Sequence, residues 1–398
     1  MIEFLGQAAA YILPFIVVLA LVVFVHEFGH FQVARWLGVR VEAFSIGFGK
    51  ALAHWTGKSG VIYRIGLVPL GGYVKFVGDA DGSSRPDTSM PKAPPESGLF
   101  HAQPVWKRAA IVAAGPAANF IFAVLAFGAV FYGRGETVLL PRVGVVEAGS
   151  AAAQAGFRPG DMILRADDRS IDSFDDLRLV VSLSAGRDVD FVVDRAGREL
   201  TLTATPRLVR QDTGLGTREK QGRLGVGPSQ DPADVKLIRY NPIEALGRGA
   251  GQCMTIVEAT FRFVGQLISG GMSAESLSGP MGIGHMSGQI TMGAAASAEA
   301  AGVDWLTGTI HVLISLLLFS AVLSVSVGLI NLAPIPVLDG GHLLFYGVEA
   351  ISGKPVSETV QAVGYRVGLA CVLALFVFAT FNDLQRLGVF GFVGRLFS

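Results

Sequence analysis

The stretch AAAYILPFIVVLALVVFVHEFGH, residues 8 to 30, joins an uncharged apolar run to two histidines and a glutamate. The run Ala8–Val25 is close to the roughly 20 apolar residues that a helix needs to cross a lipid bilayer. Ionisable side chains at the end of such a run are costly unless they pair or bind something, so by default they indicate a functional site. The stretch therefore predicts a membrane helix that carries chemistry.

The composition of the whole chain agrees with a membrane protein. Of its 398 residues 51% are hydrophobic and 16% are charged, and the formal net charge of zero gives no indication of a nucleic-acid partner. We predict a polytopic α-helical membrane protein with four transmembrane helices, the last of them short. The predicted spans are Ala8–Val25, Ala109–Tyr132, Val312–Ala333 and Val367–Phe381.

Basic residues predict how these spans are oriented. The segment between the first two spans is rich in Lys and Arg, whereas the residues before the first span contain neither. Because basic loops stay in the cytoplasm, we expect a multi-pass membrane protein whose first and third spans end on the cytoplasmic side. The resulting parts are a membrane core in two halves, residues 1–132 and 312–398, an external domain at 133–230, and an external amphipathic helix and loop at 231–311.

The segment that follows HEFGH alternates apolar and other residues and is interrupted by several glycines between residues 47 and 72. This pattern predicts short strands joined by turns. They form either surface hairpins or a hairpin that enters the membrane, and the second option implies a polar site beside it. Residues 79–104, rich in Pro, Ser, Gly and Asp, are expected to be a cytoplasmic linker.

The external segment predicts a small α+β domain. Its sequence AQAGFRPGDMILRADDRSI, residues 153 to 171, and its order of elements resemble PDZ domains of membrane and periplasmic proteases. The alternative is an α+β domain with no binding role. Residues 242–268 predict an amphipathic helix on the membrane surface, and residues 293–302 a loop. Expected strands are Arg142–Val146, Met162–Ala166, Val189–Asp194 and Glu199–Thr205, and expected helices are Ala151–Ala155 and Ser173–Ser182, with Ser173 as the N-cap.

HEFGH has the HExxH spacing of a metal site. Residues four apart lie on one face of a helix, so His26 and His30 can bind the same ion, and Glu27 can take a proton from water beside it. Zinc suits imidazole nitrogen, and a catalytic zinc needs a third protein ligand and an open position. HExxH is short enough to arise by chance, and the alternative is a pair of histidines at the membrane interface.

A candidate third ligand follows the third span, in LINLAPIPVLDGGH, residues 329 to 342. Pro334 and Pro336 cannot donate backbone hydrogen bonds, so the helix is expected to end near Asn331. Asp339 then lies on irregular backbone, beside glycines that allow close approach. By the orientation argument Asp339 is at the same membrane face as His26 and His30, and these three residues would leave a fourth position for water.

At this point the chain closely resembles the site-2 protease family, in its bacterial RseP type of intramembrane zinc metalloprotease. The resemblance is carried, in order and over nearly the whole chain, by HEFGH (26–30), SIGFG (45–49), GPAAN (115–119), LSGPMGI (277–283) and NLAPIPVLDGG (331–341). One departure is visible, because the external segment has room for one PDZ domain whereas some members carry two.

The resemblance implies one zinc per chain, held by His26, His30 and Asp339, with Glu27 as the catalytic base. It implies that Asn331 contacts substrate or the transition-state oxygen, although an amide that satisfies backbone freed by the prolines is the alternative. It also implies a membrane re-entrant β-hairpin, and we expect its segment Ile46, Gly47, Phe48 and Gly49 to pair with the unwound substrate as an added strand.

Membership further implies regulated intramembrane proteolysis. The expected substrate is a single-span membrane protein that an upstream, site-1-type protease has already trimmed, and it is cut in or near its transmembrane helix. The expected surroundings are the lipid bilayer of the bacterial inner membrane, with the active site towards the cytoplasm, the PDZ domain at 133–230 in the periplasm, and no nucleic acid. Two other functions compete with this one. A non-catalytic PDZ-bearing adaptor or chaperone would not need the metal residues, and a zinc transporter fits poorly because the first two spans offer almost no polar residues at mid-membrane.

Overall fold

The structure, a computed structural model, describes residues 2–78, 94, 97–212, 218–269 and 277–386. It divides into two compact units. The helical unit comprises Met1–Ala129, Ala245–Thr260 and Leu277–Ser398, and the strand-rich unit comprises Val130–Glu244 and Phe261–Ser276. Most of the predicted linker, residues 79–93, 95 and 96, lies outside the described residues. Each unit is described by itself.

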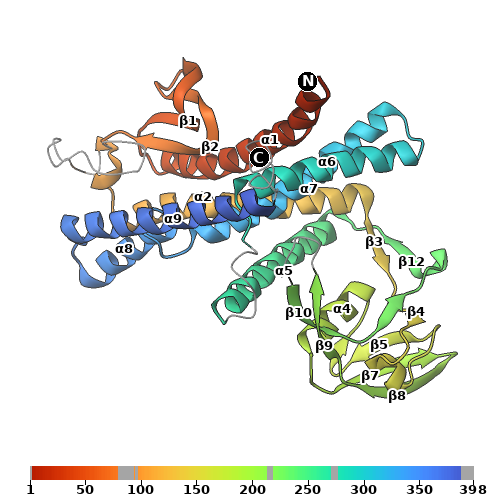
Figure 1. Ribbon diagram of the computed structural model, residues 1–398. Coiled ribbons are helices and arrows are strands. Elements are labelled where there is room, and N and C mark those ends of the chain that lie inside the picture. The colour runs from red at the N-terminus through yellow and green to blue at the C-terminus, as the bar shows by residue number, and fades with distance from the viewer. Residues whose placement is uncertain (1, 79–93, 95–96, 213–217, 270–276, 387–398) are drawn as a thin grey trace, which may run out of the picture. The chain divides into compact units, whose positions relative to one another are not determined.

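Four helices among the described residues are long and apolar enough to cross a membrane, which confirms the four predicted spans. All four extend beyond the apolar runs at one end or both, and α1 continues through HEFGH without a break (Figure 1). The fourth is a full-length span and not a short one. They are α1 (Ile2–Trp36), α2 (Val105–Arg134), α7 (Trp305–Asn331) and α9 (Glu358–Arg386).

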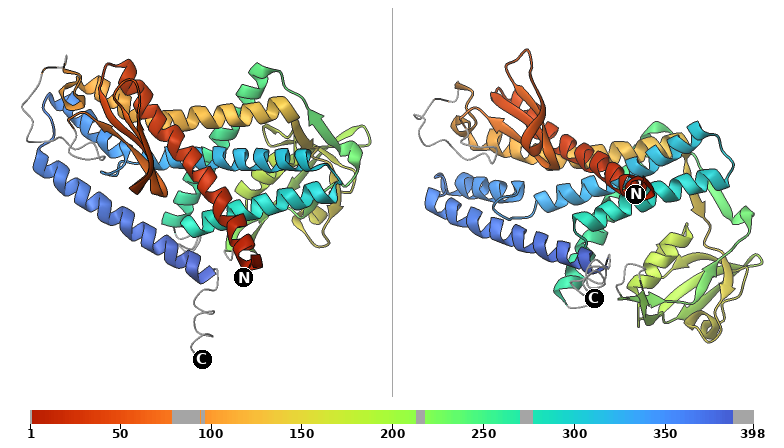
Figure 2. Two further views of the ribbon diagram at one scale, coloured as in Figure 1. Left: turned by 90° about the horizontal axis from the view of Figure 1, so that it is seen from above. Right: turned by 45° about the horizontal axis from the view of Figure 1, so that its top comes forward.

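The prediction of a loop at residues 293–302 is wrong, because this stretch belongs mostly to helix α6 (Pro280–Ala300). Alanine has the highest helix propensity, so the Ala-rich residues of this stretch favour a helix, and glycines earlier in α6 serve its packing. A Cβ atom at Gly288 would lie 2.0 Å from Tyr11 Cδ1 of α1, so only glycine permits this approach. The helix lies beside α1 and α7 in both views of Figure 2.

The LSGPMGI motif at the start of α6 is held by a carboxylate from the last span. Asp383 of α9 is buried, and its two oxygens accept hydrogen bonds from the backbone N–H groups of Gly279, at 3.0 Å, and Gly282, at 2.8 Å. These N–H groups have no partner within their own helix, because they belong to its first turn. A carboxylate within a span is therefore paired, as the membrane requires.

Strands β1 (Val41–Thr56) and β2 (Ile62–Phe76) form one long hairpin and not the predicted set of short strands. The glycines lie inside the strands, where register shifts bend them. As a result residues 41–46 pair on one side with residues 72–76 and on the other with residues 62–65. Apolar side chains of the hairpin, α1, α2 and helix α8 (Asp339–Ser352), among them Phe31, Phe44 and Phe76, form a shared core with Phe100 of the 3-10 turn Phe100–Ala102.

Helix α7 ends at Asn331, as the two prolines predicted. Asp339 is not on irregular backbone, however, but is the first residue of helix α8 (Asp339–Ser352). The chain turns back on itself here, and Gly340 makes the turn possible, since a Cβ atom there would lie 2.3 Å from the carbonyl oxygens of Leu332 and Ala333. Asp339 is thus fixed by a helix on one side and a tight turn on the other.

The strand-rich unit has the predicted order of strands and helices. Its four-stranded sheet has the order β6-β5-β7-β8, and Ser173 caps α4 as expected, in a capping box with Asp176. The unit continues past residue 230, because β12 pairs with β3. Its elements are β3 (Glu136–Leu139), β4 (Val143–Val146), α3 (Ala151–Ala155), β5 (Met162–Ala166), β6 (Arg169–Ser170), α4 (Phe174–Leu183), β7 (Val189–Arg195), β8 (Arg198–Ala204), β9 (Arg207–Asp212), β10 (Arg218–Arg223), β11 (Val226–Pro228) and β12 (Val235–Ile238).

Residues 242–268 form helix α5 (Pro242–Ile268), which confirms the predicted amphipathic helix. Its buried residues Ala245, Gly249 and Cys253 are four apart and so lie on one face. Gly249 lets this face meet α2 closely, since a Cβ atom there would lie 2.6 Å from the Val124 carbonyl oxygen. Helix α5 is not among the four candidate spans found in the described part of the chain.

Candidate active site

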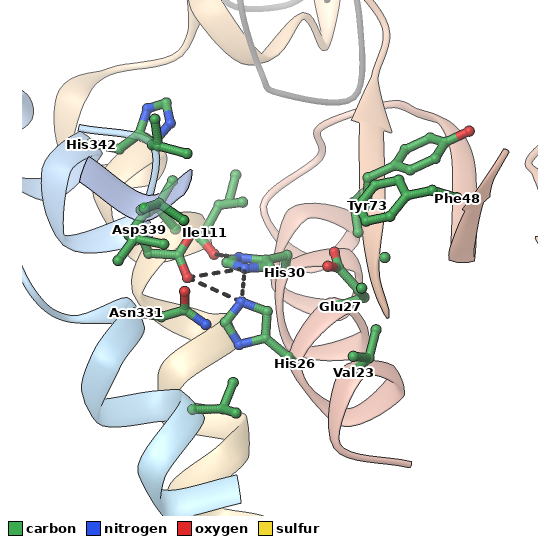
Figure 3. Close-up of a pocket in the computed structure, with 18 of the residues that line it drawn as sticks. Val23, His26, Glu27, His30, Phe48, Tyr73, Ile111, Asn331, Asp339 and His342 are labelled. Carbon is green, nitrogen blue, oxygen red and sulfur yellow. Dashed lines mark hydrogen bonds and ion pairs between the residues drawn. The ribbon is translucent and has the colours of Figure 1, made fainter. Parts of the chain in front are cut away.

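The two histidines of HEFGH lie on one face of α1, buried in the helical unit, as the spacing of four predicted. Their Nε2 atoms are 3.2 Å apart and point in the same direction (Figure 3). Asp339 reaches the same point from the start of α8, and its Oδ2 lies 3.1 Å from His26 Nε2 and 3.5 Å from His30 Nε2. The three predicted ligands therefore meet, although more than three hundred residues separate the carboxylate from the histidines.

The spacing of these three atoms fits a zinc ion. Ligand atoms that bind zinc at about 2.1 Å and tetrahedral angles are about 3.4 Å apart from each other. The observed separations of 3.1, 3.2 and 3.5 Å lie around this value. Asp339 Oδ2 is close to both imidazoles but makes no hydrogen bond of good geometry with any described residue. Three electron-pair donors that converge on one point are what a cation site requires.

Glycines bring the helices close enough for this convergence. A Cβ atom at Gly115 of α2 would lie 2.2 Å from His30 Nε2 and 2.9 Å from His26 Cε1. One at Gly29 of α1 would lie 2.3 Å from the Ala114 carbonyl oxygen. The glycine within HEFGH and the glycine of GPAAN therefore allow α1 and α2 to cross almost in backbone contact, with the imidazoles between them.

Helix α2 also holds the outer nitrogens of both imidazoles. His30 Nδ1 lies 2.9 Å from the Ile111 carbonyl oxygen, and His26 Nδ1 lies 3.1 Å from Asn119 Nδ2. Neither Ile111 nor Asn119 was among the predicted site residues. The signal for Asn119 was present in the GPAAN motif, but a single asparagine in an apolar helix is more often a packing residue than part of a site.

Glu27 lies beside the three ligands without joining them. It is buried and lines the same cavity, where Gly72 of β2 approaches it so closely that a Cβ atom would lie 2.8 Å from Glu27 Cγ. The cavity has a volume of ≈ 580 Å³, and apolar residues of α1, α2, α7 and α9 form part of its wall. These are Leu19 and Val23 of α1, Ile111 and Val112 of α2, Val327 of α7 and Val372 of α9.

Asn331 and His342 line this cavity as well, Asn331 from the last residue of α7 and His342 from α8. Figure 3 shows the Asn331 carboxamide next to Asp339 and His26. His342 Nδ1 lies 3.2 Å from the Tyr365 hydroxyl of α9, and burial lowers the pKa of His342 below its ordinary value.

Burial opposes the ionisation of Asp339, but His30 and His26 outweigh it and hold the Asp339 pKa well below its ordinary value.

Of the four residues predicted to pair with substrate, the structure places only Phe48 at the cavity. Ile46 has pairing partners on both of its sides, Gly72 and Ile65, so it cannot take an added strand. The hairpin segment that lines the cavity is instead Gly71–Val74. Phe48 supports it, because its ring stacks on Tyr73 and covers Gly71, where a Cβ atom would lie 2.5 Å from the ring.

Comparison with known proteins decides the family. A family model described as Peptidase family M50 matches residues 14–375, which include all the residues of this site. The chain belongs to peptidase family M50. It is 42% identical over 392 residues to Metalloprotease MmpA of Caulobacter vibrioides, covering 96% of this chain and 97% of the relative. It is 41% identical over 394 residues to a protein of Agrobacterium fabrum that has the provisional name of a zinc metalloprotease, covering 96% and 97%.

This M50 peptidase is thus a zinc metalloprotease with several membrane spans, which confirms the resemblance to the site-2 proteases. Among solved structures, the chain has a likeness to the PDZ domain of the SdrC-like protein from Listeria monocytogenes. The match covers 22% of this chain and 84% of that structure, at 18% identity and a TM-score of 0.18. A likeness at this level carries no argument about the strand-rich unit.

Proposed function

We propose that this M50 peptidase cuts its substrate within the membrane, with His26, His30 and Asp339 as the zinc ligands and Glu27 as the general base. The observation that carries the proposal is the convergence of three ligand atoms, within 4.8 Å of one another, in a cavity walled by apolar residues of membrane spans. Three ligands leave one position of a tetrahedral site open, as a catalytic zinc needs.

The zinc, when bound, supplies Lewis acidity that makes water a stronger nucleophile and polarises the scissile carbonyl. Glu27 takes the proton of the attacking water and passes it to the leaving nitrogen, which suits a carboxylate that lines the cavity without joining the ligands. The Asn331 carboxamide faces the same space and is positioned to donate a hydrogen bond to the developing oxyanion.

The substrate reaches this site as an extended segment. A peptide bond in a helix is shielded by its own hydrogen bonds, so the helix must unwind before water can attack. Segment 72–76 pairs with residues 41–46 along one side, and we propose that the unwound substrate pairs along its other side, next to Glu27. This places the added strand on Gly71–Val74 and not on Ile46–Gly49. The hairpin is then membrane re-entrant, because it pairs with a segment drawn from the bilayer.

We propose the cellular role that the resemblance to the site-2 proteases implies. The substrate is a single-span membrane protein, trimmed first by a site-1-type protease and then cut in or near its span, which is regulated intramembrane proteolysis. We place the protein in the bacterial inner membrane, with the zinc site towards the cytoplasm and the strand-rich unit, as a PDZ domain, in the periplasm. The basic segment after α1 supports this orientation, and the order of elements in the strand-rich unit supports the PDZ assignment.

The test combines Glu27→Gln and Asp339→Asn in the full-length protein. Glu27→Gln is expected to retain zinc and to lose cleavage of a single-span substrate in detergent, whereas Asp339→Asn loses both. Cells with either variant are expected to accumulate trimmed membrane fragments that the wild type removes. Normal turnover by Glu27→Gln would refute the role of the base. Unchanged cell function with Asp339→Asn would favour a PDZ-bearing adaptor over a protease.

A further inference from the structure

Asn119 is a fully buried residue of α2 whose side chain meets the outer nitrogen of His26. Its exposed fraction is 0%, and α7 holds it in place from the opposite side. The Ser324 hydroxyl donates to the Asn119 main-chain oxygen at 3.0 Å, and Gly328 approaches so closely that a Cβ atom would lie 3.2 Å from Asn119 Cβ. The Asn119 side chain therefore has little freedom other than rotation of its carboxamide about the Cβ–Cγ bond.

The two ring nitrogens of His26 face different partners. Nε2 points to His30 and Asp339, and Nδ1 points to Asn119. A neutral imidazole carries its proton on one nitrogen only, so Nε2 has a free electron pair for a metal when Nδ1 carries the proton. An Nδ1–H group buried in this position needs an acceptor, and a side-chain carbonyl is one.

The carboxamide of Asn119 can serve either tautomer. As it stands, Nδ2 lies 3.1 Å from His26 Nδ1, while the buried Oδ1 accepts no hydrogen bond from any described residue. This arrangement suits a metal-free site, in which Asn119 donates to Nδ1 and His26 Nε2–H faces Asp339 Oδ2 at 3.1 Å. Rotation of the carboxamide by 180° brings Oδ1 to the position of Nδ2, where it accepts from Nδ1–H and frees Nε2 for a cation.

We propose that Asn119 is a positioning residue for the zinc site, which accepts a hydrogen bond from His26 Nδ1 and so directs the electron pair of Nε2 towards the metal. His30 has the equivalent support from the Ile111 carbonyl oxygen, at 2.9 Å. The proposal explains why an uncompensated polar atom, Asn119 Oδ1, is kept in an apolar helix. It rests on the proposed ligand role of His26.

The test measures the zinc affinity of the full-length protein in detergent by competition with a chromophoric chelator. Asn119→Leu, which removes the acceptor at similar size, is expected to weaken zinc binding by about 10- to 100-fold, the usual effect of losing such a partner. Asn119→Asp can only accept, so it is expected to bind zinc at least as tightly as the wild type. Ser324→Ala is the matched control, because it removes an equally buried contact to the Asn119 main chain and leaves the carboxamide intact.

The outcomes separate this inference from the proposed function. His26→Ala is included, and if it keeps its zinc then the proposed metal site itself is wrong. If His26→Ala loses zinc while Asn119→Leu binds as the wild type does, the positioning role alone is overturned. Should Asn119→Leu fail to fold, Asn119→Asp still decides between donor and acceptor, since it keeps the size of the side chain: a role as a hydrogen-bond donor predicts loss of zinc and the acceptor role predicts its retention.

Discussion

Substitution of Gly115 by alanine is expected to destroy the zinc site while leaving the helical unit folded. A Cβ atom at residue 115 would lie 2.2 Å from His30 Nε2 and 2.5 Å from His30 Cε1. An ordinary contact needs at least 3.4 Å, so the imidazole must move by about 1.2 Å. Metal–ligand distances tolerate only about 0.2 Å. The ring also cannot move freely, because its other nitrogen is tied to the Ile111 carbonyl oxygen.

We expect Gly115→Ala to weaken zinc binding by at least about 100-fold, equivalent to about 2.7 kcal/mol. The assay is chelator competition on the purified protein, with the thermal unfolding of the metal-free form measured in parallel. Gly133→Ala is the matched control, since it makes the same change in the same helix where no atom lies within 4 Å. It is expected to bind zinc normally and to be neutral or slightly stabilising. Zinc affinity of Gly115→Ala within about threefold of the wild type would refute the proposed packing of α2 against the ligands.

Three further predictions concern other parts of the molecule. A chelator such as 1,10-phenanthroline should abolish cleavage in detergent and added zinc should restore it; activity that survives complete zinc removal would contradict the proposed chemistry. Asp383→Asn should lower the free energy of unfolding of the metal-free protein in urea by about 1.5–3 kcal/mol, because it weakens two charge-assisted hydrogen bonds from Gly279 and Gly282. Glu299→Gln, on the exposed face of α6, is the control and should change this free energy little. Burial opposes the ionisation of Asp161, but hydrogen bonds from Arg195 and Arg158 hold its pKa below the ordinary value of 3.8. The charged form therefore stabilises the strand-rich unit above about pH 4, and this contribution is lost as the pH falls through the lowered pKa. The protection factors of the amides in β5 and β7, which correct the exchange rates for the pH dependence of intrinsic exchange, should therefore fall on acidification in the wild type, and much less in Asp161→Asn.

The sequence predicted those features that depend on local pattern or on membrane topology. Apolar run length gave the four spans, and the spacing of four put His26 and His30 on one face of α1. Asp339 could be predicted as the third ligand because only the first and third predicted spans have their C-terminal ends on the cytoplasmic side. This leaves only a few carboxylates in the chain as candidates. Pro334 and Pro336 correctly predicted the end of α7 at Asn331.

The features that sequence reasoning missed depend on contacts between helices and strands. Asn119 contacts His26 because α1 and α2 cross at this point, and the spacing of residues within either helix does not predict the crossing. Residues 293–302 were interpreted as a loop although most of them belong to α6, and the glycines of the hairpin were interpreted as turns, whereas Gly47 and Gly66 lie against each other inside the sheet. The hairpin register places Gly71–Val74 at the cavity and encloses Ile46, and register is set by the bulges rather than by the apolar pattern.

In the proposed site His26, His30 and Asp339 hold one zinc ion between α1 and the start of α8. The most direct measurement is anomalous X-ray scattering at the zinc absorption edge from crystals of the full-length protein. One peak per chain is predicted, at about 2.0–2.2 Å from His26 Nε2, His30 Nε2 and Asp339 Oδ2, with Glu27 outside bonding distance. A zinc peak at other residues, or bound through Glu27 in place of Asp339, would contradict the account.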